Sequence, residues 1–200
     1  MILKEQECML KRYSALDYNY SIGKHPFNNS INIEFKEYVG INLQQIAFWP
    51  NTLSTNNDFL QKQLNINKLP TFNKGIVNSD FSVWRIEPLK FWILDKNVNL
   101  TEDLGTTLDM SHAFTCLNIS GEMATLLLSR HLPIDLREKN FPPGSSASSA
   151  IHHVSIKLLK YSENNYHLFI PRGFAASIWE IILESSKQFG YEILERSQRT

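Results

Sequence analysis

The second half of the chain alternates between strand-like and helix-like apolar patterns in an order that few folds accommodate. From Phe114 onward, stretches of period two predict strands, and stretches with apolar residues three or four apart predict helices. The predicted strands are 114–119, 152–161, 166–170 and 191–194, and the predicted helices are 120–132 and 173–189. The resulting order of strand, helix, strand, strand, helix, strand is that of the ferredoxin-like split βαβ unit.

Local signals set the expected ends of these elements. Ser120 is predicted to cap the first helix, with Glu122 in the first turn, where the helix dipole favours an anion. Pro133 is predicted to end that helix, and Gly190 suits the left-handed position that ends the last one. The segment 141–149 is rich in Pro, Gly and Ser and is predicted to be a loop.

The first half of the chain shows the same order of predicted strands and helices, with weaker periodicity. Its predicted elements are strands at 31–36 and 39–49, a helix from Ser54 to about Asn65, hairpin strands at 83–87 and 91–95, and a helical turn at 100–104. The predicted fold class is therefore α+β, built from two split βαβ (ferredoxin-like) halves. We expect an N-terminal arm at 1–30 and a single domain at 31–200, with pseudo-halves 31–112 and 113–200.

Composition and charge exclude several classes of protein. The 200 residues are 42% hydrophobic, as in a globular domain, and 20 basic residues balance 20 acidic ones. Because no basic excess exists to neutralise phosphates, we expect no nucleic-acid partner. No apolar run is long enough to span a bilayer, and the N-terminus does not read as a signal peptide, so we expect a cytoplasmic protein. Cys8 and Cys116 are expected to be free thiols.

Asp109, Ser111 and His112 supply the residue types of a hydrolytic triad, but their spacing argues against one. On a strand, positions 109 and 111 share a face and 112 points to the other, whereas a triad needs the histidine between its partners. We predict a strand end whose side chains hydrogen-bond the neighbouring turn. The adjacent His152 and His153 would likewise point opposite ways on a strand, and no further ligands complete a zinc site.

Two other segments have a functional reading beside a structural one. Residues 144–149 could hold an anion by their backbone N–H groups, but the Gly-Lys-Ser/Thr of a P-loop is missing, so we predict a connection. Arg172 could bind a carboxylate, but a structural salt bridge is the prediction. Because no Gly-x-Gly-x-x-Gly occurs, FAD or NAD should not be held by the Rossmann route. We assign no catalytic, cofactor-binding or metal-binding residue to this chain.

Four motifs, taken together, resemble a known family. They are Asp-Met-Ser-His at 109–112, Pro-Ile-Asp-Leu at 133–136, Phe-Pro-Pro-Gly at 141–144 and Ile-Pro-Arg-Gly-Phe-Ala-Ala-Ser-Ile-Trp at 170–179. Their order and spacing resemble the γ subunit of heterotetrameric sarcosine oxidase. That subunit is itself similar to the folate-binding part of aminomethyltransferases such as the glycine-cleavage T-protein. The likeness is strongest over 109–190 and looser over 31–95.

The resemblance implies a non-catalytic structural subunit with α, β and δ partners. Such a complex oxidatively demethylates sarcosine to glycine, with peroxide as a product and the one-carbon unit passed to tetrahydrofolate. FAD, FMN, NAD, tetrahydrofolate and zinc are expected on the other subunits and none of them on this chain. Two alternatives stay open: a free-standing folate-binding or aminomethyltransferase-like protein, and an interaction module that shares only the fold.

Two aromatic residues near the last predicted helix are candidates for the contact with a larger subunit. Trp179 follows Ile178 and is expected at the edge of the inward helix face, and Phe174 lies at the start of the helix. Aromatic residues at such edges are enriched in protein interfaces. We therefore predict that Phe174 and Trp179 belong to a subunit interface.

Overall fold

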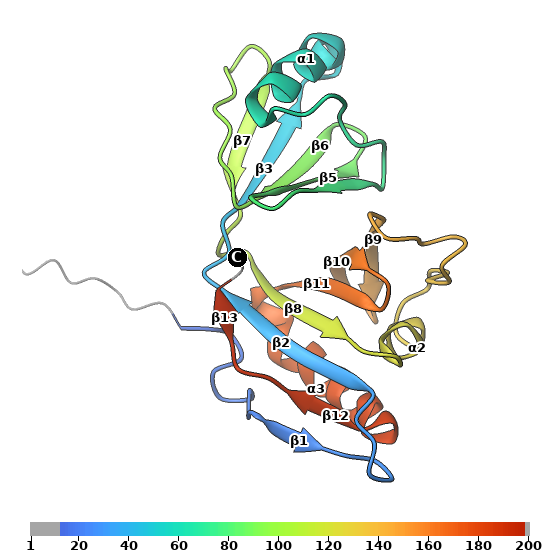
Figure 1. Cartoon of the computed structure of the whole chain (residues 1–200). Coiled ribbons are helices and arrows are strands. Elements are labelled where there is room, and N and C mark those ends of the chain that lie inside the picture. Colours follow the sequence, from blue (N-terminus) through green and yellow to red (C-terminus); the bar gives the residue numbers. More distant parts are fainter. Residues whose placement is uncertain (1–12, 199–200) are drawn as a thin grey trace, which may run out of the picture.

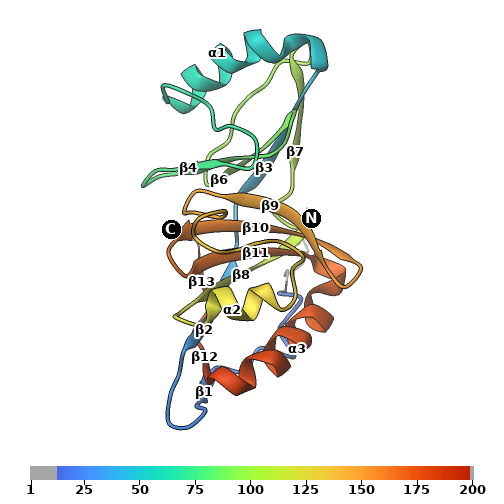
Figure 2. The same ribbon diagram turned by 90° about the vertical axis from the view of Figure 1, so that its right-hand side faces the viewer.

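The computed structural model describes residues 13–198, apart from the side chains of residues 53–56. Two β-sheets are stacked on one another, and helices cover their outer faces, so that the layers run α, β, β, α (Figures 1 and 2). The class is α+β, as predicted.

The larger sheet carries the helices of the second half. Its order is β1 (Gly23–His25), β12 (Tyr191–Ile193), β2 (Ile33–Val39), β8 (Phe114–Ser120), β11 (Asn165–Pro171), β10 (Val154–Ser162) and β9 (Ser146–Ile151), with β13 (Ser197–Gln198) also paired to β2. Helices α2 (Ala124–Ser129) and α3 (Ala175–Ser186) pack on its outer face (Figure 2). The split βαβ unit β8–α2–β10–β11–α3–β12 is present as predicted, with β2 inserted between β12 and β8.

The smaller sheet repeats this topology. Its order is β4 (Gly75–Val77), β5 (Ser82–Glu87), β6 (Lys90–Leu94), β3 (Leu43–Phe48) and β7 (Gly105–Asp109), with α1 (Leu53–Leu64) on its outer face. Strands β3, β5, β6 and β7 occupy the places of β8, β10, β11 and β12 in the larger sheet. The connection from β6 to β7 has no helix, and a hydrogen-bonded turn, with Leu104 N bonded to Thr101 O at 3.0 Å, replaces the predicted helical turn.

The predicted boundary between the two halves is wrong, because β2 belongs to the larger sheet. Its partners are β8 and the C-terminal strands β12 and β13. The chain crosses between the sheets at 40–42 and returns at 110–113, so the smaller sheet is an insertion spanning 43–109. Residues 39–49 are accordingly not one strand: Val39 ends β2, and Gly40 turns the chain with φ +65°. Alternation defines the two faces of a strand but does not tell which sheet it joins.

Several predicted element ends also need correction. Ser120 is the last residue of β8 and caps no helix, because α2 begins four residues later with Met123 in the N-cap position. Glu122 therefore precedes the helix. Helix α1 begins at Leu53, before Ser54, after the 3₁₀ turn η1 (Pro50–Thr52). The predicted loop at 141–149 ends early, since β9 starts at Ser146 and pairs with β10 through backbone groups, which every residue except proline supplies in full.

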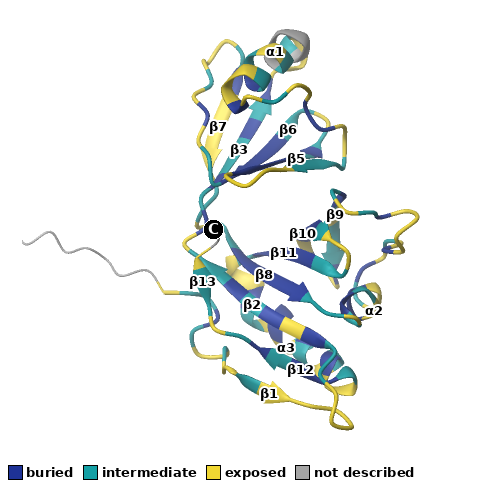
Figure 3. Ribbon diagram, in the orientation of Figure 1, coloured by how far each residue is buried: buried dark blue, intermediate teal, exposed yellow. Residues whose placement is uncertain are grey.

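Strict alternation along the strands builds three apolar layers. Tyr166, Leu168 and Ile170 of β11 face α2 and α3, whereas Phe169 faces the smaller sheet. In β6 the side chains alternate in the same way: Phe91 and Ile93 pack with α1, whereas Trp92 and Leu94 face the larger sheet. The layer between the sheets includes Trp84, Trp92, Leu94, Cys116, Leu159 and Phe169. These strands read as continuous apolar runs because both of their faces are buried (Figure 3). Cys116 keeps its thiol, and Cys8 lies outside the described residues.

The described part of the N-terminal arm packs on the domain surface. Its strand β1 extends the larger sheet through β12, and Leu16 is fully buried against the α3 side of the core. The arm also passes under Gly190, where φ is +68° and an added Cβ would lie 2.0 Å from Ser30 O. Only glycine fits this position, because both the backbone angle and the close approach of the arm exclude a side chain.

Candidate functional site

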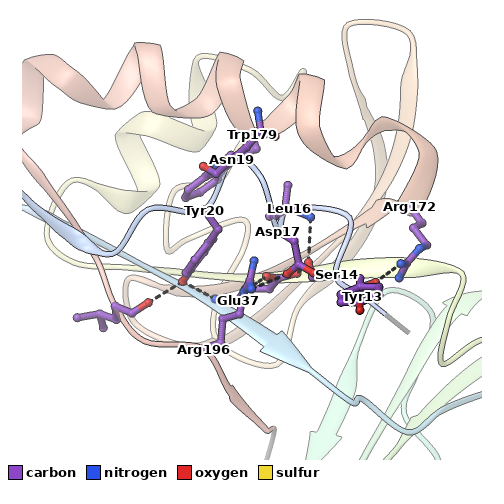
Figure 4. A network of polar contacts seen from close by, with 11 residues as sticks. Tyr13, Ser14, Leu16, Asp17, Asn19, Tyr20, Glu37, Arg172, Trp179 and Arg196 are labelled. Carbon is purple, nitrogen blue, oxygen red and sulfur yellow. Dashed lines mark hydrogen bonds and ion pairs between the residues drawn. The ribbon is translucent and has the colours of Figure 1, made fainter. Parts of the chain in front are cut away.

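A buried carboxylate on β2 holds the arm in place (Figure 4). Glu37 is 3% exposed and accepts hydrogen bonds from Ser14 Oγ and, at 2.6 Å, from Arg196 Nε. Arg196 Nη1 lies 2.6 Å from Asp17 Oδ1. One guanidinium from the C-terminal segment thus bridges a carboxylate of the sheet and a carboxylate of the arm. A buried charge is tolerated in a fold when it is paired in this way.

Tyr20 and Trp179 complete this attachment (Figure 4). Tyr20 Oη donates to Leu194 O at 2.8 Å and accepts from the backbone N of Glu37 at 2.9 Å. Burial raises the pKa of Tyr20, so the hydroxyl stays protonated and can donate. The Tyr20 ring stacks on Trp179 at 5.6 Å between centroids, and Trp179 Nε1 donates to Asn19 O at 3.0 Å.

A cavity of about 180 Å³ lies beside this network, at the place where the chain passes between the sheets. It is bounded by the arm at 13–15, by the two crossings and by the start of the last helical segment. Among the side chains discussed in the sequence analysis, Ser111, His112 and Arg172 line it, together with Glu37. Motifs far apart in the sequence therefore converge on one cavity.

The geometry confirms a strand end at 109–112. Asp109 Oδ1 accepts from the backbone N of Ser111 at 2.9 Å, and Ser111 Oγ accepts from the backbone N of Leu43 at 3.0 Å. These bonds tie the return crossing to the outgoing one, and Met110 N adds a bond to Leu43 O at 2.8 Å. Asp109 and Ser111 thus act in the turn that connects the sheets.

Arg172 and Trp179 occupy other roles than predicted. The Arg172 guanidinium donates to the backbone carbonyl of Tyr13, where a salt bridge was expected. Trp179 is 0% exposed, since the arm covers it, and it therefore has no surface to offer a partner subunit. The interface prediction for Trp179 is wrong, because the sequence did not reveal that residues 15–20 pack against that helix edge. Phe174 is 48% exposed, near His153, and its interface role stays a prediction.

The two remaining motifs, at 152–153 and 144–149, form a turn and backbone hydrogen bonds within the fold. His152 and His153 form the exposed turn between β9 and β10, and the residues that the structure describes contain no group of three or more His, Cys, Asp and Glu that could hold a metal. The backbone N–H groups of 144–146 bond to Lys160 O, Pro142 O and Asn73 O. They are thus used within the fold. The predicted connection at 144–149 is confirmed only at its start, because residues 146–149 belong to β9. No helix in the described range is long and apolar enough to cross a membrane.

A second cavity, of about 230 Å³, lies between the sheets, and sequence reasoning missed it. Its lining includes Tyr38 of β2, Asp95 after β6, and Tyr161 and His167 of β10 and β11. The His167 ring is 5% exposed and stacks on Tyr161 at 3.9 Å, as a core histidine. Stretches of the chain that lie far apart in sequence supply these four residues, and the stacking of the two sheets brings them together.

His131, after α2, gives the fold a defined response to acid. Burial lowers its pKa from the ordinary value of 6.5, and the nearby charges of His152 and Arg130 act in the same direction. The unfolded chain therefore takes up this proton first as the pH falls through about 6.5, and the folded state loses stability there. We expect the free energy of unfolding to fall less between about pH 7.5 and about pH 5.5 in His131→Gln than in the parent chain, as measured by urea denaturation. An equal fall in both proteins would contradict this assignment.

These features define an α+β protein with the folate-binding aminomethyltransferase-like fold: two stacked sheets with repeated split βαβ topology and helices outside. The structure is similar to a chain of heterotetrameric sarcosine oxidase from Corynebacterium sp. U-96, with a TM-score of 0.73 and 16% identity over 92% of this chain and 99% of that one. It is also similar to the glycine cleavage system aminomethyltransferase T from Bartonella henselae, with a TM-score of 0.60 and 10% identity over 88% of this chain. The chain spans 56% of that second structure. No protein-family model and no curated protein matches the sequence.

Proposed function

We propose that this chain is a structural, non-catalytic subunit of an oxidoreductase complex like heterotetrameric sarcosine oxidase, in the place of the γ subunit. The proposal rests on how completely the two chains match in structure: the match covers 99% of the chain in that complex and 92% of this chain. In this proposal α, β and δ partners carry FAD, FMN, NAD, tetrahydrofolate and zinc, and the assembly works in the cytoplasm on sarcosine or a related N-methyl amine.

The use of polar side chains within the fold supports this role. Glu37 and Arg196 attach the arm, and Asp109 and Ser111 join the two crossings. Groups that could serve acid–base chemistry thus serve the fold, and what the chain offers a larger complex is its shape and its surface.

Co-expression with the α, β and δ subunits of such a complex is the direct test. We expect a stable complex that oxidises sarcosine and releases peroxide, and we expect the purified chain alone to do neither of these reactions. A tightly held flavin, or turnover by the isolated chain, would contradict the proposal.

Phe174 gives a prediction about the contact surface. Its ring is 48% exposed at the start of α3, and charging such a contact residue typically costs about 2 kcal/mol or more of binding free energy when it lies in the centre of an interface. We expect Phe174→Asp to weaken co-purification about tenfold or more, measured by titrating the chain against the partner subunits. Phe72→Asp is the matched control, because Phe72 is 50% exposed on the loop before β4. Equal affinity of the parent chain and Phe174→Asp for the partner subunits would show that Phe174 does not lie in the interface.

A free-standing folate-binding or aminomethyltransferase-like protein is the second candidate, favoured by the likeness to aminomethyltransferase T and by the aromatic cavity between the sheets. That cavity of about 230 Å³ is smaller than pockets that enclose drug-sized ligands, which start at roughly 300 Å³, so it would surround only part of a folate. Thermal unfolding with and without tetrahydrofolate separates the two: a concentration-dependent rise in melting temperature supports the second candidate.

A further inference from the structure

A third cavity, of about 250 Å³, lies where the loop before β4 meets the loop before β9. One wall comes from the smaller sheet at 73–74, and the other comes from residues 134–147 of the larger sheet. The two walls meet through backbone bonds of 2.8 Å, from Gly75 N to Gly144 O and from Ser146 N to Asn73 O. The cavity is therefore a property of the junction between the two sheets.

The polar side of this cavity has an excess of donors. Lys74 Nζ donates to Ser145 Oγ at 2.7 Å, and across residues 13–198 no carboxylate lies within ion-pair distance of Lys74. Ser146 also lines the cavity. The residue is 2% exposed, and its hydroxyl is buried without a hydrogen-bond partner in the described part of the chain. A buried hydroxyl in this state costs free energy until a partner reaches it.

Neighbouring charges do not neutralise Lys74, because they neutralise one another. Asp135 pairs with Arg137 at 2.6 Å, and Glu138 pairs with the buried Lys160 at 2.7 Å. Lys160 Nζ also donates to Phe141 O at 2.9 Å, and its backbone N bonds to Ser145 O at 2.9 Å. This buried cation holds the wall of the cavity in one conformation, so a ligand would meet a preformed site.

The rest of the lining is apolar and the space is small. Ile134, Phe141 and Ala147 supply the apolar wall. A volume of about 250 Å³ holds about eight water molecules at roughly 30 Å³ each, which corresponds to a ligand of about ten non-hydrogen atoms. A single fixed cation with adjacent hydroxyls recognises an oxyanion, and the apolar wall favours an anion that carries a hydrocarbon body.

We propose that this cavity binds a small organic carboxylate. The carboxylate contacts Lys74 Nζ and the hydroxyls of Ser145 and Ser146, and the apolar body packs against Ile134 and Phe141. Because the site joins loops from both sheets, its occupation stabilises their junction.

Benzoate is a suitable probe, and the isotopically labelled full-length chain can be titrated with it by NMR. We expect saturable shifts of the backbone amide signals of Lys74, Gly75, Ser145 and Ser146, with a dissociation constant on the order of 1 mM. Lys74→Met should weaken binding about tenfold or more, because it removes the charge-assisted contact. Ser146→Ala should weaken it about threefold. Lys68→Met is the control of equal charge change, since Lys68 is exposed away from the cavity, and it should bind like the parent.

Several outcomes would overturn the proposal. They are the absence of saturable shifts at these amides, equal loss of affinity in Lys68→Met and Lys74→Met, and binding of inorganic phosphate as tight as that of benzoate, which would deny a role to the apolar wall. The amide spectrum of each variant reports whether it is folded. If Lys74→Met is not folded, Ser146→Ala and the comparison of benzoate with phosphate decide the result.

Discussion

Replacing Trp179 by alanine should lower the free energy of unfolding of the chain by about 3–5 kcal/mol, the usual cost of removing a large buried aromatic side chain. Trp179 is 0% exposed, stacks on Tyr20 at 5.6 Å and meets Phe35 edge-to-face at 5.2 Å. Its removal leaves a cavity under the arm and deprives Asn19 O of the indole donor. Urea denaturation of the isolated chain measures this loss, which is a large share of the 5–15 kcal/mol typical of a domain.

Two comparisons make the Trp179 prediction specific. Trp179→Phe keeps a ring against Tyr20 and Phe35 but removes the bond to Asn19, so its cost should be clearly smaller than that of Trp179→Ala. Protease cleavage near residues 15–20 should become faster in Trp179→Ala, since that segment loses its support. If Trp179→Ala were as stable as the parent but failed to bind partner subunits, Trp179 would be an interface residue after all.

Replacing Arg196 by methionine should cost about 2–3 kcal/mol. Removing one partner of a fully buried ion pair costs about 3–5 kcal/mol, and the lower figure applies here because the Arg196 side chain keeps 28% exposure. The loss arises at Glu37, which is 3% exposed and, among the described residues, would retain only Ser14 as a side-chain partner. Methionine keeps most of the packing of the arginine stem, so the comparison isolates the charge.

A double-mutant cycle tests the origin of this cost. The double variant Glu37→Gln, Arg196→Met should lose less free energy of unfolding than the sum of the two single variants, by about 1 kcal/mol or more. The reason is that the double variant no longer contains the buried carboxylate that Arg196→Met deprives of its cation. Arg137→Met serves as the exposed control, since the Arg137 side chain is 81% exposed and its solvent-screened pair with Asp135 should contribute little to stability. Simple additivity in the cycle would show that Arg196 acts through packing alone.

The sequence predicted the positions of the strands and helices better than it predicted which strands pair with one another. The apolar periodicity placed the hairpin at 83–95, the strands of the second half and the last helix, because burial of one face leaves its period in the sequence. It failed at β2, where alternation runs on through Gly40 although the chain changes sheets there. It also failed at β9, where the run Ser-Ala-Ser-Ser pairs through its backbone and carries no apolar signal.

The candidate sites were predicted less well, for the same reason. The turn role of Asp109 and Ser111 follows from a spacing of two residues along the chain, and it was predicted. The burial of Trp179 depends on the arm, about 160 residues away in sequence, and the cavity beside Lys74 depends on two loops from different sheets. Neither has a local signature.

The sequence by itself determined the α+β class and the repeated split βαβ order, because these depend on short-range periodicity and spacing. Only the tertiary structure decided that β2 joins the C-terminal strands, that Arg196 pairs with Glu37 across 159 positions, and that Lys74 faces Ser145 across the junction of the sheets. Hydrogen bonds and charges act between any groups that folding brings together. Which groups meet is set by the packing of whole sheets, and that information is spread over the entire chain.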